Sequence, residues 1–134
     1  MAGVTHLNAE ATTFVTERHL ATLSTLRADG TPHTVAIAFT YDPEAGIVRV
    51  ITSGGSQKAR NAERGGYAAV TQVDGGRWIT LEGPARVFTD REHVGEAERR
   101  YALRYRVPRE NPARVVIEID VQRTMGSPTL RGER

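Results

Sequence analysis

Ile51-Thr52-Ser53-Gly54-Gly55-Ser56-Gln57-Lys58-Ala59-Arg60-Asn61 is the stretch that decides how the rest of the sequence is interpreted. The apolar run at 47–51 predicts a strand that leads into it, and the helix formers at 57–64 predict a short helix that follows it. Its two glycines permit positive φ and a close approach of the backbone to a ligand. Ser56 is a suitable N-cap, and the free N–H groups of a helix start favour an anion. The stretch therefore predicts a strand, a polar turn that can hold a ligand, and a helix.

Lys58 is the only lysine of the chain, and every other basic side chain apart from histidine is arginine. A compact ammonium group is not equivalent to a planar guanidinium, so its position here indicates a phosphate contact. A solvated charge at a helix start is the alternative. The stretch lacks the Gly-Lys-Ser/Thr of a P-loop and the Gly-x-Gly-x-x-Gly of a dinucleotide site, so it belongs to neither class.

The composition predicts one globular cofactor-binding domain over residues 1–134, with a loose polar tail at about 127–134. The chain has 39% hydrophobic and 25% charged residues, no cysteine, and a net charge of only +2. That small charge and the scattered arginines argue against a nucleic-acid partner. No apolar run reaches the length of a membrane span, and no secretory signal begins the sequence. We therefore expect a cytoplasmic protein with no membrane or nucleic-acid partner.

The strand and turn signals predict a mainly β fold with helices. Six strands are predicted, at residues 19–26, 33–41, 47–52, 67–73, 77–87 and 114–125. Helices are predicted at 8–18, 57–64 and 90–106. Asp29-Gly30 marks a tight turn, and Pro84 predicts a bulge or a sheet edge. Six closely spaced antiparallel strands predict a closed or nearly closed barrel with helices packed around it.

The sequence contains no arrangement of residues typical of acid–base, nucleophilic or metal catalysis. The four histidines are far apart and lack the spacing of metal ligands. There is no Gly-x-Ser-x-Gly elbow, and the acid pairs Asp42/Glu44 and Glu96/Glu98 are typical of surface residues. No catalytic residue and no metal ligand is assigned. A ligand-holding turn without such groups is expected where a cofactor carries the reaction.

Three runs of the sequence resemble the flavin and deazaflavin oxidoreductases related to pyridoxamine 5′-phosphate oxidase: residues 19–26, 29–33 and 51–61. The resemblance extends from about residue 14 to residue 126. It implies a six-stranded antiparallel split β-barrel of the FMN-binding type. It also implies a homodimer with two cofactor sites at the subunit interface.

Within that family, residues 54–58, 73–78, 100–106 and 114–118 are most similar to the branch that uses the deazaflavin coenzyme F420 and reduces biliverdin. This similarity implies an F420-dependent reductase that delivers a hydride to a conjugated small-molecule acceptor, with biliverdin as the leading acceptor. A linear tetrapyrrole carries two propionates, which suit an arginine-rich rim.

The family resemblance also implies a role for individual residues at the cofactor. The phosphate contacts would be Lys58, Ser56, Gln57 and Asn61. The residues along the deazaflavin ring would be Pro32, His33, Thr34 and Val35. The contacts to the ring edge or ribityl chain would be Thr52 and Ser53. Trp78 would pack near the ring from the partner subunit, or serve only as an anchor of the interface. His33 could equally be an exposed residue at a strand start.

Two alternatives remain open on the same fold. FMN-dependent oxidases of the family typically have an arginine two residues before the phosphate lysine, where this chain has Ser56. That difference disfavours FMN, although some deazaflavin relatives have arginine there. An FMN-dependent enzyme is therefore one alternative, and a protein that binds F420 or a tetrapyrrole without turnover is the other.

Overall fold

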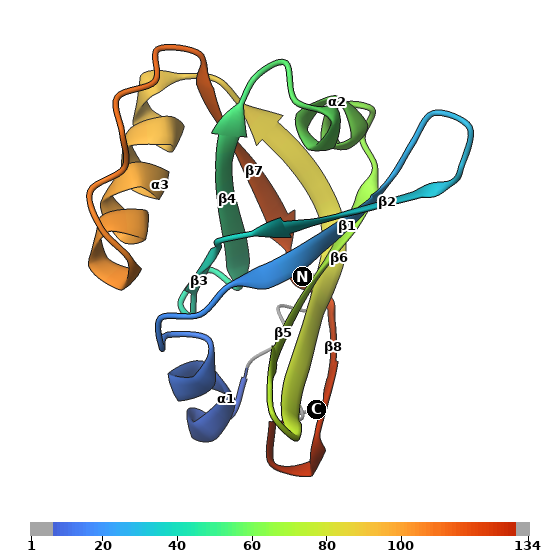
Figure 1. The fold of residues 1–134 in the computed structure, drawn as a ribbon, viewed down its shortest axis with the longest axis vertical. Coiled ribbons are helices and arrows are strands. Elements are labelled where there is room, and N and C mark those ends of the chain that lie inside the picture. The colour runs from blue at the N-terminus through green and yellow to red at the C-terminus, as the bar shows by residue number, and fades with distance from the viewer. Residues whose placement is uncertain (1–6, 131–134) are drawn as a thin grey trace.

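A computed structural model describes residues 7–130, which form one antiparallel sheet of eight strands with three α-helices around it (Figure 1). The helices are α1 (Ala9–Phe14), α2 (Gln57–Glu63), α3 (Arg91–Arg104) and the short 3-10 helix η1 (Pro128–Leu130). The strands are β1 (Ala21–Leu26), β2 (Pro32–Ile37), β3 (Thr40–Asp42), β4 (Ile47–Ser53), β5 (Tyr67–Asp74), β6 (Arg77–Phe88), β7 (Arg114–Asp120) and β8 (Arg123–Gly126). The mainly β class predicted from the sequence is confirmed.

The two strands at the ends of the sheet are neighbours in the sequence. The hydrogen-bonded order is β2-β1-β5-β6-β7-β4-β3, with β8 paired to β6. β2 and β3, the two ends of this path, are consecutive strands joined by Ala38 and the fully buried Phe39. The sheet is therefore a curled, split barrel whose ends are connected through the chain and not through a strand ladder.

β6 is the strand that the two halves of the sheet share. Its residues 77–84 pair with β5, and residues 79–82 also pair with β8, whereas residues 85–88 pair with β7. At the change of partner, a Cβ on Gly83 would overlap the backbone oxygen of Asp120. Glycine is required there because the chain crosses β6 at this point. The bulge or edge predicted from Pro84 is in fact this exchange of strand partners.

The core lies inside the curled sheet and is closed at one end by α1 and η1. Its largest fully buried side chains include Phe14, Leu23, Phe39, Ile117 and Leu130. The Asn8 side chain accepts a hydrogen bond of 2.8 Å from the Ala11 backbone and so caps α1.

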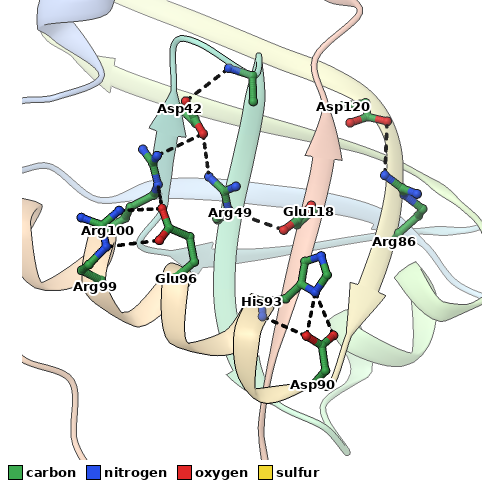
Figure 2. Close-up of polar contacts among 11 residues, drawn as sticks. Asp42, Arg49, Arg86, Asp90, His93, Glu96, Arg99, Arg100, Glu118 and Asp120 are labelled. Carbon is green, nitrogen blue, oxygen red and sulfur yellow. Dashed lines mark hydrogen bonds and ion pairs between the residues drawn. The ribbon is translucent and has the colours of Figure 1, made fainter.

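A network of arginines and carboxylates holds α3 against the sheet (Figure 2). Asp42 is 6% exposed, and its Oδ2 lies 3.2 Å from Arg49 Nη1 and 3.1 Å from Arg100 Nη2. Arg49 also reaches Glu118 at 3.5 Å, and Arg100 reaches Glu96 at 2.6 Å. Burial alone would raise the pKa of Asp42, but the Ala45 N–H and the two guanidinium groups hold that pKa below its usual range.

Several boundaries differ from the predicted ones. The count of six strands is wrong because the predicted strand at 33–41 divides into β2 and β3, and the one at 114–125 divides into β7 and β8. The prediction of a loose tail is wrong for residues 127–130, since Leu130 is fully buried and Ser127 is 9% exposed. Residues 131–134 of that tail lie outside the described part of the chain. None of the helices within residues 7–130 combines the length and apolar character that a membrane crossing requires.

Candidate functional site

The turn between β4 and α2 is held by its own hydroxyl groups. Thr52 donates to Ser56 Oγ at 3.1 Å, and Ser56 Oγ accepts the Ala59 N–H at 3.3 Å. Ser56 is therefore the N-cap of α2, as predicted. Neither Gly54 nor Gly55 has a positive φ. The close approach at Gly54 is to the chain before β7, because its N–H donates to Ala113 O at 2.9 Å.

Beside this turn is a groove of about 390 Å³. One wall comes from residues 36–38 at the end of β2 and 51–53 at the end of β4. The other comes from Tyr101 of α3 and from the segment 106–114 that follows it, and the first turn of α2 contributes Lys58. Asn111 fixes that segment to the turn by donating to Ser53 Oγ at 3.0 Å. The groove thus joins residues that are far apart in the sequence.

The charges that line the groove are all positive, and most of them are unpaired. Arg114 donates to Glu98 at 2.7 Å. Lys58, Arg106 and Arg109 make no side-chain hydrogen bond or ion pair with any residue in the range 7–130. Cations gathered in a concave surface attract an anionic ligand. α2 has only seven residues, so an anion in the groove would depend on these side chains more than on the helix start.

A comparison with known protein families finds a match over residues 7–126 to the model described as pyridoxamine 5′-phosphate oxidase. The chain belongs to this family. The resemblance noted in the sequence is therefore confirmed at the level of the family.

Among curated relatives of the family, the F420H(2)-dependent biliverdin reductase of Mycobacterium tuberculosis is 58% identical over 126 residues, which are 94% of this chain and 92% of that protein. Among solved structures, a conserved hypothetical protein from Mycobacterium tuberculosis has a TM-score of 0.77 at 26% identity, over 89% of this chain and 82% of that one. A structure titled F420 Reductase has a TM-score of 0.69 at 21% identity, over 84% of this chain and 94% of that one. The last likeness shows the shared fold alone.

The predicted phosphate contacts of this oxidase-family chain separate into two groups. Lys58 faces the groove, but Asn61 is 2% exposed and belongs to the packing beneath the turn. Its amide donates to Thr25 at 2.9 Å, and its oxygen accepts from Gln57 at 2.7 Å and from Arg64 at 2.8 Å. Asn61 thereby fixes α2 to β1, and Gln57 supports the Asn61 side chain, which holds Lys58 in place.

The predicted ring contacts on β2 lie away from the groove. In β2 the groove is lined by Ala36 and Ile37, whereas residues 32–35 are nearer the hairpin with β1. Val35 packs on the core, and Thr34 hydrogen-bonds Ser24 at 3.0 Å. His33 is half-buried, and its Nδ1 is buried without a hydrogen-bond partner in the described structure.

Trp78 is also outside the groove of its own chain. It is the second residue of β6, next to the β5–β6 turn, which lies at the opposite end of the sheet from α2 (Figure 1). Its backbone N–H donates to Ser127 Oγ at 3.2 Å. Of the predicted site residues, the structure thus brings Thr52, Ser53 and Lys58 together in the groove.

Apart from residues 36–38 and Ile51 in the wall formed by β2 and β4, the lining residues that the sequence did not assign to the site follow α3 or lie near its end. They are Tyr101, Arg106, Pro108, Arg109, Asn111 and Arg114. The signal that could have found them is the cluster of arginines in the extended segment after the long helix. No group of three or more possible metal ligands occurs within the described range.

A second hollow, of about 660 Å³, adjoins the groove and shares Ala38, Tyr101 and Arg106 with it. Its floor includes Tyr105, whose hydroxyl donates to His19 O at 2.8 Å or Phe39 O at 3.0 Å. Burial raises the pKa of Tyr105, so the phenol stays protonated and keeps these bonds at neutral pH.

Proposed function

We propose that this protein is an F420-dependent reductase that transfers a hydride from the reduced deazaflavin to biliverdin. The observation that carries the proposal is the groove beside the turn at 52–58, where Lys58, Arg106 and Arg109 are cations without a side-chain partner among residues 7–130. The Mycobacterium tuberculosis relative, named as an F420H(2)-dependent biliverdin reductase and 58% identical to this chain, supports the same activity.

The side chains around the groove fit a phosphate-bearing deazaflavin. Lys58 would hold the phosphate, and Thr52 and Ser53 would contact the ribityl chain or the ring edge. When bound, reduced F420 supplies a hydride from C5, and with a proton from solvent this reduces biliverdin to bilirubin. The protein positions the two reactants and keeps the segment at 106–114 fixed through the Asn111–Ser53 bond.

We also propose that the active form is a homodimer in which Trp78 of one chain lies near the cofactor of the other. The position of Trp78 away from its own groove supports this arrangement, and so does the exposure of Val73 (54%) and Met125 (47%) on neighbouring strands. Light scattering at micromolar concentration should give twice the mass of one chain. A mass equal to one chain would contradict the dimer and leave the cofactor assignment to be judged by its own test.

The activity is tested by following the oxidation of reduced F420 and the loss of biliverdin absorbance together, without oxygen. We expect both signals to change at the same rate, only with protein present, and we expect no reaction when NADPH replaces reduced F420. Tight F420 binding without biliverdin turnover would indicate another acceptor or a carrier protein. Turnover supported by reduced FMN but not by reduced F420 would refute the cofactor assignment.

A further inference from the structure

The second hollow has the chemistry of a subsite for a flat, conjugated molecule. Leu20 lines it with 64% of its surface exposed, so the hollow offers a large apolar side chain to a ligand. The rings of Tyr101 and Tyr105 lie beside it, with centroids 5.0 Å apart. Apolar and aromatic side chains that surround a small set of polar groups are typical of small-molecule sites.

Two guanidinium groups line the same hollow. Arg18 and Arg106 belong to its lining, and neither makes a side-chain hydrogen bond or ion pair with a residue of the described chain. Glu17, the acid next to Arg18 in the sequence, is already engaged, because it lies 3.7 Å from Arg77, which also lies 2.9 Å from Asp74. The two arginines are therefore available to bind carboxylates, for which a guanidinium is well shaped.

The walls of the hollow are fixed before any ligand arrives. Arg104 donates to Glu17 O at 2.7 Å, to Phe39 O at 2.7 Å and to Gln72 at 2.7 Å. Together with the Tyr105 hydroxyl, these bonds tie the chain before β1 to the end of α3 and to the link between β2 and β3. Preorganised walls reduce the entropy that a ligand must lose on binding.

We propose that this hollow is the acceptor subsite, in which Arg18 and Arg106 bind the two carboxylates of a dicarboxylate tetrapyrrole while its conjugated body lies over Leu20 and the two tyrosines. This inference rests on the proposed function, since it names the side chains that would select the acceptor. Arg106 also lines the cofactor groove, so the acceptor would lie directly beside the deazaflavin.

The test is an absorbance titration of the full-length protein with biliverdin and with biliverdin dimethyl ester, without F420. We expect Arg18→Gln to weaken biliverdin binding roughly tenfold, as for the loss of one charge-assisted hydrogen bond. The affinity for the dimethyl ester should stay unchanged. Arg91→Gln is the matched control because it removes the same charge from the other end of α3. It should leave both affinities as in the wild type.

Arg18→Gln should also bind F420 as tightly as the wild type, because Arg18 lines the second hollow and not the groove. Equal binding of biliverdin by the Arg18→Gln variant and the wild type would refute the subsite, as would an equal loss of diacid and ester. Wild-type protein that binds F420 but not biliverdin would refute the subsite and leave the cofactor site intact. Failure to bind F420 with biliverdin binding intact would refute only the proposed cofactor.

Discussion

The arginines that join α3 to the sheet and the cations of the groove belong to one chain and have opposite environments. Arg49 and Arg100 are mostly buried and each lies against two carboxylates, as Figure 2 shows. Lys58, Arg106 and Arg109 face a concave surface and have no acidic partner in the range 7–130. Pairing and burial, and not residue type, therefore separate the cations that hold the fold from those that can hold a ligand.

The cost of leaving a cation unpaired explains where each set is found. A buried charge without a partner is expensive, so the arginines between α3 and the sheet, Arg49 and Arg100, require Asp42, Glu118 and Glu96. At an open groove, water solvates the cations until an anion displaces it, so unpaired charges are tolerated there. Changes in the two regions should therefore affect different properties of the protein.

The largest effect on stability should come from Asp42→Asn. Asn keeps the acceptor for the Glu44 and Ala45 N–H groups but removes the charge that faces Arg49 and Arg100. We expect a loss of about 3 kcal/mol, the low end for breaking a buried pair, because both arginines keep a second carboxylate. Thermal unfolding at fixed protein concentration measures this loss of stability. The affinity of the folded variant for F420 should be unchanged.

Asp120→Asn is the matched control for that substitution. Asp120 pairs with Arg86 at 3.8 Å, and both side chains are exposed, at 44% and 61%. Loss of such a pair should change the stability by no more than about 1 kcal/mol. If Asp120→Asn and Asp42→Asn lowered the unfolding temperature equally, the distinction between the buried network and exposed pairs would be wrong.

The same network predicts how stability depends on pH. The pKa of Asp42 is lower in the folded protein than the value of about 3.9 for an unfolded chain, so the unfolded state binds the proton more readily. The stabilisation is then fully present above about pH 5 and is lost as the pH falls through the lower, folded-state value. Unfolding temperatures of the wild type and Asp42→Asn should converge in acid, and a constant difference down to about pH 2 would disagree with this cause.

Lys58→Ala should change binding and not stability. A charge-assisted hydrogen bond to phosphate contributes about 1.5–3 kcal/mol, so we expect roughly ten- to hundredfold weaker F420 binding with little change in unfolding temperature. Arg91→Gln again controls for the lost charge. The Lys58→Arg variant should bind F420 less tightly than the wild type. Normal F420 binding by that variant would show that a cation is needed at this position but that it need not be a lysine.

The smallest effect should be that of salt. Raising the ionic strength from about 0.1 to about 1 M shortens the Debye length from about 10 to about 3 Å, which screens exposed charges far more than buried ones. We expect F420 binding to weaken severalfold in KCl while the stability contributed by Asp42 persists. Binding that is insensitive to salt would mean that the cations of the groove do not contact the ligand.

Local signals in the sequence predicted much of the fold because they act over a few residues. Gly30 has φ +87° at the predicted Asp-Gly turn, and Ser56 caps α2 as its side chain allows. The separation of β3 from β2 was missed because Phe39 is as apolar as the strand residues beside it. The break between β7 and β8 was missed because it depends on the crossing at Gly83, a contact with a distant segment.

The site was only partly predictable for the same reason. Lys58 with Thr52 and Ser53 could be found because they are neighbours in one turn. Arg106 and Arg109 reach the groove because α3 and the segment after it return to the end of β4, and no local pattern encodes that return. The burial of Asn61 likewise depends on Thr25, which is 36 residues away.

Parallel titration of the purified protein with F420 and with FMN is the most direct test of the proposed F420 site at Lys58. We expect F420 to bind more tightly than FMN. We also expect Lys58→Ala to remove most of the F420 affinity while the unfolding temperature stays at the wild-type value. Tighter binding of FMN, or F420 affinity that is the same in Lys58→Ala and the wild type, would contradict the proposed site.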